Sequence, residues 1–236
     1  MVFLAKKDLN HWIKFIKMLL EYCCYNKNLI EDVDSELMNI FKAVGMGFLG
    51  IAVPFHILRQ ISQDLMVIPD ISIACPIDYP LGAGDKKVRQ HESIVALKSG
   101  ANCLDVTMNP YLFKKSSKRA IHNDINPIAA ICSDHGAELR VIINYELYDT
   151  QDAVEICGIL ADVGVDAIIP SAGFSNDDIF DNIMFCKILE EDLGIPSICT
   201  GRMWLDKHYK AALNSQISGI RAYCLPNVIE LGVDSW

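Results

Sequence analysis

Short apolar runs alternate with longer amphipathic stretches along most of the chain. The clearest run lies within 164–175, where Ala167 to Ile169 are apolar, Pro170 closes the run, and small residues follow. This pattern is typical of a buried parallel strand whose carboxyl end leads into a loop and a helix. Comparable runs predict six more strands, at 48–53, 70–75, 103–108, 139–144, 195–200 and 219–224. An eighth strand is expected near 22–29.

The stretches between these runs have the spacing of helices that bury one face. The predicted helices lie at 34–44, 55–64, 86–98, 116–135, 150–163 and 176–192. In the first of them the expected inward residues are Leu37, Ile40, Phe41 and Val44. A further amphipathic helix is predicted over 8–22, covering the bottom or side of the domain. Alternatively, its Trp12 and Phe15 form a dimer contact.

Strands that recur about every 25–35 residues with helices between them indicate repeated βαβ units and a parallel sheet. The chain shows no linker, so we expect one α/β domain over 1–236, a (β/α)8 TIM barrel with the 8–22 helix added. The alternative is an open doubly wound sheet. No Gly-x-Gly-x-x-Gly sequence directly connects a predicted strand to the helix that follows it, as a dinucleotide-binding fingerprint would, which favours the barrel.

Composition narrows the class of protein. The net charge of −9 and pI near 5.1 disfavour a nucleic-acid partner, which needs a basic face. No stretch of about 18 apolar residues predicts a membrane span, and the first residues lack the layout of a signal peptide. We therefore expect a cytoplasmic protein without a membrane partner.

The nine cysteines have no Cys-x-x-Cys spacing, so neither a zinc site nor a redox motif is predicted. Most of them interrupt apolar runs and are expected to be reduced core residues. The cysteines expected in the core are Cys23, Cys75, Cys103, Cys132, Cys157, Cys186, Cys199 and Cys224.

Several motifs occur in an order and spacing that resemble the deoxyribose-phosphate aldolase family. They are Tyr79-Pro-Leu-Gly82, Gly100-Ala-Asn-Cys-Leu-Asp-Val106 with Pro110-Tyr111, Leu139-Arg-Val-Ile-Ile143, and the 164–175 stretch. The resemblance covers roughly 28–230. It implies a (β/α)8 barrel and a class I aldolase, which cleaves 2-deoxyribose 5-phosphate through a lysine Schiff base without a cofactor.

The resemblance assigns the family's site position by position. The aspartate of the proton relay falls on Asp105. The Schiff-base lysine falls on Ile169, and the second lysine falls on Ile198. Arg202 replaces a loop glycine, and Arg221-Ala-Tyr-Cys224 stands where a Gly-Thr-Ser-Ser segment helps to hold the phosphate.

These replacements change the expected chemistry. A Schiff base requires a primary amine with a lowered pKa, and isoleucine has no amine. Bulky Arg202 and Tyr223 would also crowd the backbone approach to a phosphate. Authentic aldolase activity is therefore not what the sequence predicts.

Two interpretations stay open for each remaining candidate. Asp105 is a retained relay or substrate-binding carboxylate, or it is a buried partner of Arg140 on the next strand. Arg202 and Arg221 form a new anion site, or they pair with acids such as Asp206 or Glu230.

Other polar residues complete the predicted substrate site. Asn109, with Tyr111, binds a substrate hydroxyl or caps the following helix. Ser171, Thr200 and Gly201 lie at the predicted strand ends, where barrels place their chemistry.

A relocated Schiff-base lysine would have to come from Lys86, Lys87, Lys114 or Lys115, which the sequence places in solvated positions. His91 and Glu92 are adjacent on a helix and cannot face the same way. Without a third ligand nearby, no metal site is predicted.

The favoured hypothesis is a barrel of this family without Schiff-base chemistry, which binds a small anionic, phosphosugar-like ligand or a protein partner, with a homo-oligomer as an open possibility. The alternative is an active carbon–carbon lyase with a site rebuilt around Asp105 and Arg202. A third hypothesis is that the aldolase activity of the family persists weakly on a phosphosugar. An amine within reach of the barrel mouth would favour the lyase.

Overall fold

The computed structural model describes residues 18–25, 32–115, 118–173, 177–201, 203 and 205–225, and the side chains of Lys114 and Lys115 fall outside this description. The strands are β1 (Leu19–Cys23), β2 (Gly50–Ala52), β3 (Ser72–Ile77), β4 (Cys103–Thr107), β5 (Glu138–Ile142), β6 (Ala167–Ile169), β7 (Ile198–Cys199) and β8 (Gly219–Ala222). The helices are α2 (Val33–Gly45), α3 (Phe55–Leu65), α4 (Lys86–Lys98), α5 (Tyr111–Lys115), α6 (Lys118–His135), α7 (Thr150–Val163), α8 (Ile179–Leu193) and α9 (Asp206–Asn214).

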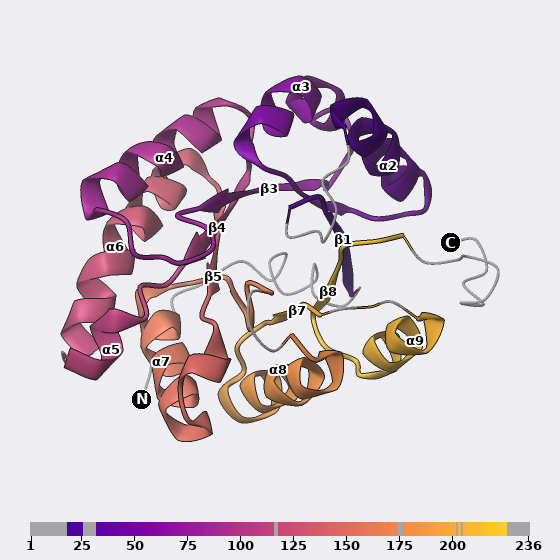
Figure 1. Ribbon diagram of the computed structural model, residues 1–236. Helices are drawn as coiled ribbons and strands as arrows, with labels where there is room; N and C mark the ends of the chain where they lie inside the picture. The colour runs from indigo at the N-terminus through magenta and orange to yellow at the C-terminus, as the bar shows by residue number, and fades with distance from the viewer. Residues whose placement is uncertain are drawn as a thin grey trace.

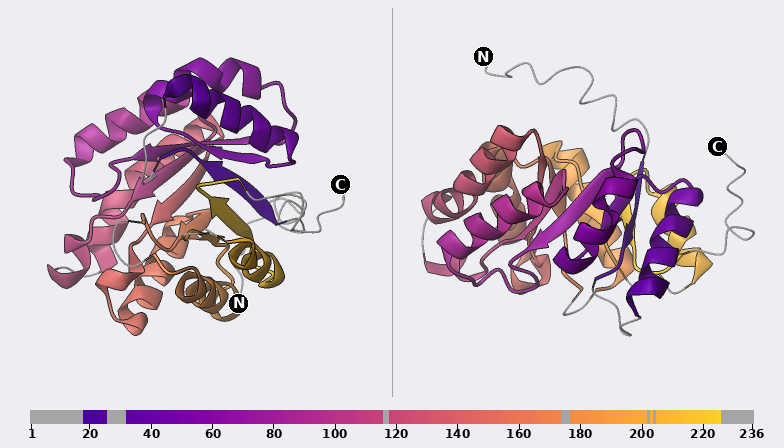
Figure 2. Two further views of the ribbon diagram at one scale, coloured as in Figure 1. Left: turned by 45° about the vertical axis from the view of Figure 1, so that its right-hand side comes forward. Right: turned by 90° about the horizontal axis from the view of Figure 1, so that it is seen from above.

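All eight strands lie in one parallel sheet with the order β6-β5-β4-β3-β2-β1-β8-β7. The pairing of β1 with β8, from Leu19 opposite Gly219 onward, joins the two ends of the described chain. A single parallel bridge between Ile168 and Ser197 links the two edge strands. The sheet curls into a ring with the helices outside it (Figures 1 and 2). The predicted TIM barrel is confirmed.

The predicted helix over 8–22 is wrong where the structure describes it. Leu19–Cys23 forms β1, and the remainder of that range, with Trp12 and Phe15, lies outside the described residues. β1 takes backbone hydrogen-bond partners on both sides, from β2 and from β8. Tertiary pairing of this kind overrides a local helical pattern, because it satisfies the backbone groups of both neighbouring strands.

α2 begins one residue earlier than expected, because Asp32 rather than Asp34 or Ser35 is its N-cap and accepts a hydrogen bond from the Ser35 amide. Ile40 is buried as predicted. The prediction that Phe41 faces the core is wrong, since its side chain is 46% exposed on the outer side of the helix.

The cysteines are free thiols, and most of the predicted ones are buried. Cys224 is the exception among them: it is exposed, because it follows the end of β8, where its thiol donates to the Met203 carbonyl. The other seven pack in the barrel or beneath the helices, as expected of small apolar residues.

Two separate layers of side chains fill the molecule. The larger core lies between the sheet and the helices and is dominated by isoleucine, leucine and valine. Inside the barrel, one small cluster contains Ile142, Ala167, Ile169, Ala172 and Ile198, and another contains Cys23, Ala52, Ala74 and Cys103. Polar residues share the interior with these clusters and form the candidate site.

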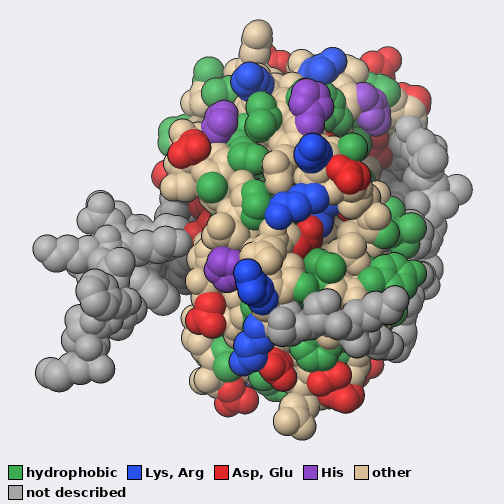
Figure 3. Space-filling view, turned by 90° about the vertical axis from the view of Figure 1, so that its left-hand side faces the viewer, with side chains coloured by type: hydrophobic (Ala, Val, Ile, Leu, Met, Phe, Trp, Pro, Cys, Tyr) green, Lys and Arg blue, Asp and Glu red, His purple; other side chains and the backbone are tan. Residues whose placement is uncertain are grey.

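On the face covered by α4 and α6, a row of lysine and arginine side chains is flanked by aspartate and glutamate (Figure 3). Charges of both signs are therefore interspersed there. None of the described helices is both long and apolar enough to cross a membrane.

Candidate functional site

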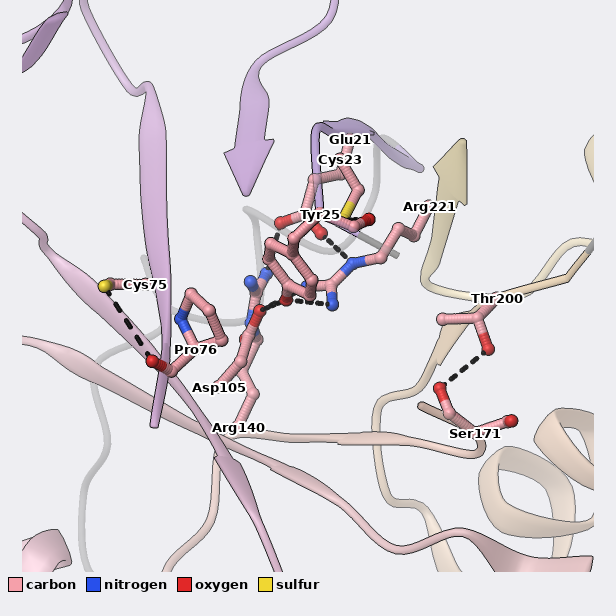
Figure 4. Close-up of polar contacts among 10 residues, drawn as sticks. All are labelled: Glu21, Cys23, Tyr25, Cys75, Pro76, Asp105, Arg140, Ser171, Thr200 and Arg221. Atoms are coloured by element: carbon pink, nitrogen blue, oxygen red, sulfur yellow. Dashed lines mark hydrogen bonds and ion pairs between the residues drawn. The ribbon is translucent and has the colours of Figure 1, made fainter. Parts of the chain in front are cut away.

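Four charged side chains meet inside the barrel. Glu21 comes from β1, Asp105 from β4, Arg140 from β5 and Arg221 from β8, and each is at most 1% exposed. Figure 4 shows them pointing toward one another from opposite sides of the barrel. We call these four residues the charge network.

Each acid of the charge network contacts both arginines. The Asp105 carboxylate accepts from Arg140 Nε at 2.7 Å and from Arg221 Nη2 at 2.5 Å. Arg140 Nη1 lies 2.8 Å from Glu21 Oε2, and Arg221 Nε donates to Glu21 Oε1. Two carboxylates and two guanidinium groups leave the network without net charge, which is the condition for burying ions at moderate cost.

Small residues on the neighbouring strands make room for these long side chains. A Cβ atom added at Gly50 of β2 would lie only 2.8 Å from Glu21 Cβ. Ala52 and Ala74 also face the interior and are fully buried. The small residues of β2 and β3 thus leave room for the charged side chains of β1, β4, β5 and β8.

Tyr25, two residues beyond β1, covers the charge network. Its hydroxyl donates to Asp105 Oδ2 at 2.8 Å and accepts from Arg221 Nη1 at 2.8 Å. Its ring meets Tyr79 edge-on with centroids 4.9 Å apart. Burial raises the pKa of the Tyr25 hydroxyl well above its usual value, so the group is neutral at physiological pH.

The same contacts fix the ionisation of the network. Burial alone would raise the pKa of Asp105, but the charges of Arg140 and Arg221 more than offset it and hold that pKa below the usual 3.8. Burial likewise opposes the charged forms of both arginines, but the nearby Asp105 and Glu21 carboxylates raise their pKa values. Asp105, Arg140 and Arg221 are therefore charged.

The predicted site residues Ser171 and Thr200, which follow β6 and β7, lie apart from the network (Figure 4). Thr200 Oγ1 donates to the Ser171 carbonyl at 3.2 Å, and Ser171 Oγ accepts from the Gly173 amide at 2.9 Å. Gly201 is buried against the start of α8, where an added Cβ would come within 2.9 Å of Ile179. These contacts hold the two loops together.

Ile169 and Ile198 belong to one buried apolar cluster, against which Tyr79 packs. Both side chains are almost completely buried. The two positions that the family resemblance assigns to lysines are thus neighbours in the barrel interior and are surrounded by hydrocarbon.

The remaining candidates are dispersed. Asn109 Oδ1 accepts from the Tyr111 amide at the start of α5, which is a capping contact. Lys86 and Lys87 are exposed at the start of α4, where Lys86 donates to the Asn123 carbonyl. Arg202 lies outside the described residues, as do the side chains of Lys114 and Lys115.

His91 is exposed on α4, while Glu92 accepts from the Asp78 amide at 3.0 Å. Within the described ranges, no three His, Cys, Asp or Glu side chains are placed to hold a metal ion.

Asp105, Arg140 and Arg221 are among the candidates predicted from the sequence, whereas Glu21 and Tyr25 are not. The pair of Asp105 with Arg140, one of its two interpretations, is present in the structure. Arg221 pairs with the acids Glu21 and Asp105, whereas Glu230, one of the partners predicted for it, lies outside the described residues. The alternation Leu19-Glu21-Cys23, with every second residue facing inward, is the signal that could have revealed Glu21.

Comparisons with known proteins agree with the barrel fold. No protein-family model matches the chain. The deoxyribose-phosphate aldolase of Thermococcus kodakarensis is 26% identical over 159 residues, which cover 65% of this chain and 70% of that protein. The deoxyribose-phosphate aldolase of Thermococcus gammatolerans is 26% identical over 128 residues, or 53% of this chain. The chain spans only 57% of that relative.

Among solved structures, the deoxyribose-phosphate aldolase of Aeropyrum pernix, described as tetrameric, superposes with a TM-score of 0.74 at 18% identity. The match covers 89% of this chain and 86% of that chain. An aldolase from Coccidioides immitis gives the same TM-score at 16% identity, over 89% of this chain and 82% of that chain. These similarities establish the shared barrel fold.

Proposed function

We propose that the chain, as a distant member of the deoxyribose-phosphate aldolase family, lacks Schiff-base aldolase activity and binds a small ligand or a protein partner at the barrel mouth. The observation that carries this proposal is the apolar cluster around Ile169 and Ile198. A class I aldolase needs an amine there, held in a site that lowers its pKa.

The described lysines offer no replacement. None of the lysine side chains that the structure describes is buried, whereas a Schiff-base lysine is activated by removal from water or by a neighbouring cation. Lys86 and Lys87 lie on the outside of the barrel. The residues lining the described interior therefore favour binding over imine chemistry.

Asp105 also differs from a proton relay. A relay group must gain and lose a proton near the working pH. Arg140 and Arg221 hold the pKa of Asp105 below its usual value, so its carboxylate stays ionised. Its role in this proposal is to bind and orient neighbouring groups.

Arg221 already has hydrogen-bond partners within the protein, which limits the residues that could bind an anionic ligand. Its three guanidinium nitrogens donate to Glu21, Tyr25 and Asp105. An anionic, phosphosugar-like ligand would therefore depend on Arg202 and on the loops of Ser171, Thr200 and Gly201, and it stays a proposal. A homo-oligomer and a cytoplasmic location likewise stay predictions.

The test is reductive trapping. The protein is incubated with 2-deoxyribose 5-phosphate or acetaldehyde and borohydride, and its intact mass is measured. The Thermococcus kodakarensis aldolase serves as the positive control. We expect no mass increase for this protein under conditions in which the control is fully labelled.

A labelled protein would contradict the proposal and support the alternative of an active lyase. Peptide mapping would then locate the imine. Lysine-to-arginine variants at 86, 87, 114 and 115 would identify the amine, because arginine keeps the charge but forms no comparable imine.

A further inference from the structure

Tyr25 contacts the charge network in the way that a bound molecule would. Its hydroxyl hydrogen-bonds to Asp105 on β4 and Arg221 on β8, which are 80 and 196 positions away in the sequence. Its ring packs against Tyr79 and lies 5.7 Å from the Arg221 guanidinium carbon. Figure 4 shows the ring lying across the network.

The two hydrogen bonds of the hydroxyl define what the position accepts. Asp105 is ionised and only accepts hydrogen bonds, whereas Arg221 only donates them. A group that bonds to both must donate and accept at once, as a hydroxyl does. A carboxylate or phosphate oxygen would face the Asp105 charge, and an ammonium group would face Arg221, so neither fits.

The surroundings of the ring define its shape. Tyr25 packs against the small buried residues Cys23, Ala52, Ala74 and Cys103. Tyr223 packs against the same small residues, and Tyr79 meets the Tyr25 ring edge-on. An apolar ring with one hydroxyl is the complement of this position.

We propose that Asp105 and Arg221 form a binding site for the hydroxyl group of a neutral, ring-bearing small molecule, and that Tyr25 occupies this site as a built-in ligand in the free protein. The inference goes beyond the proposed function, because it concerns a neutral hydroxyl ligand beside the charge network rather than an anionic ligand at the loops of Ser171, Thr200 and Gly201. It does not depend on the outcome of imine trapping, since a hydroxyl ligand needs no carbonyl group.

The experiment removes the built-in ligand. Tyr25→Ala should bind phenol at least about ten-fold more tightly than toluene, since a hydrogen bond to a charged group contributes about 1.5–3 kcal/mol and 1.4 kcal/mol is ten-fold. Calorimetric titration gives the affinities, and the melting temperature gives a second readout. The wild-type protein should bind neither compound under the same conditions, because Tyr25 fills the site.

Tyr111→Ala is the matched control, because Tyr111 is 72% exposed and its removal creates no interior space. Equal affinities of Tyr25→Ala for phenol and toluene would overturn the proposal, as would binding of neither. If the variant does not fold, it is refolded from urea with each compound. Recovery of the native circular dichroism with phenol, but not with toluene, is then the expected result, and failure with both overturns the proposal.

Discussion

Glu21 and Asp105 each contact two arginines, so the loss of one of the four side chains leaves an uncompensated charge inside the barrel. The four residues are almost fully buried, and water cannot solvate the remaining charge. Networks of this kind are weak evidence for high stability, but breaking one is costly. The individual side chain is therefore the scale at which the network is tested.

Glu21→Gln removes one carboxylate while keeping the size of the side chain. Arg140 and Arg221 would then share a single acid, and we expect the free energy of unfolding to fall by about 3–5 kcal/mol. Urea denaturation measures the loss. Glu155→Gln, at a half-exposed glutamate paired with Lys118, should stay within about 0.5 kcal/mol of wild type. Equal effects of the two changes would contradict a structural role for the network.

The pH dependence of stability should reflect the pKa of Asp105, which is lower in the folded protein than its usual 3.8. The stabilisation from its ionised form is complete above that usual value, and it is lost as the pH falls through the lower folded pKa. The gap in unfolding free energy between wild type and Asp105→Asn should therefore be constant from about pH 5 to 8 and shrink below about pH 4. A gap that changes near neutral pH would contradict the ion pairs.

At the scale of elements, the sequence predicted most helices and strands within a few residues. The bounds of α4 agree with its prediction of 86–98, because its N-cap Asp85 and its apolar spacing are local signals. The first strand was expected near 22–29, and β1 lies earlier, at Leu19–Cys23, because its partners β2 and β8 lie far along the chain and give no local signal. The same distance hid Glu21, whose partner Arg221 is 200 positions away. Asp105 and Arg140 could be paired in advance because they lie on consecutive strands.

The close packing of β1 on β2 depends on the glycine at position 50. Gly50→Ala would place a methyl group 2.8 Å from Glu21 Cβ, and we expect a loss of about 1–3 kcal/mol of unfolding free energy. Gly158→Ala is the control, because nothing lies within 4 Å of the corresponding position in α7. That change should stabilise the protein by about 0.4–1 kcal/mol. Thermal unfolding of the two variants, with shifts of opposite sign, is the expected result.

At the scale of the whole molecule, the barrel joins sequence-distant segments around one interior. β1 pairs with β8 along four residues, from Leu19–Gly219 to Tyr22–Ala222. One bridge, Ile168–Ser197, joins β6 to β7. The charge network spans the same interior from four strands. Its formation therefore requires both ends of the described chain to be in place.

The sign of each charge follows the order of the strands. Glu21 and Asp105 lie on β1 and β4, whereas Arg140 and Arg221 lie on β5 and β8. A cut between β4 and β5 would give two half-barrels, one with two unpaired carboxylates and the other with two unpaired guanidinium groups. Neither half could bury its charges alone, but their opposite signs would attract each other. We therefore expect each half to require the other for folding, because their buried charges are opposite in sign and compensate each other.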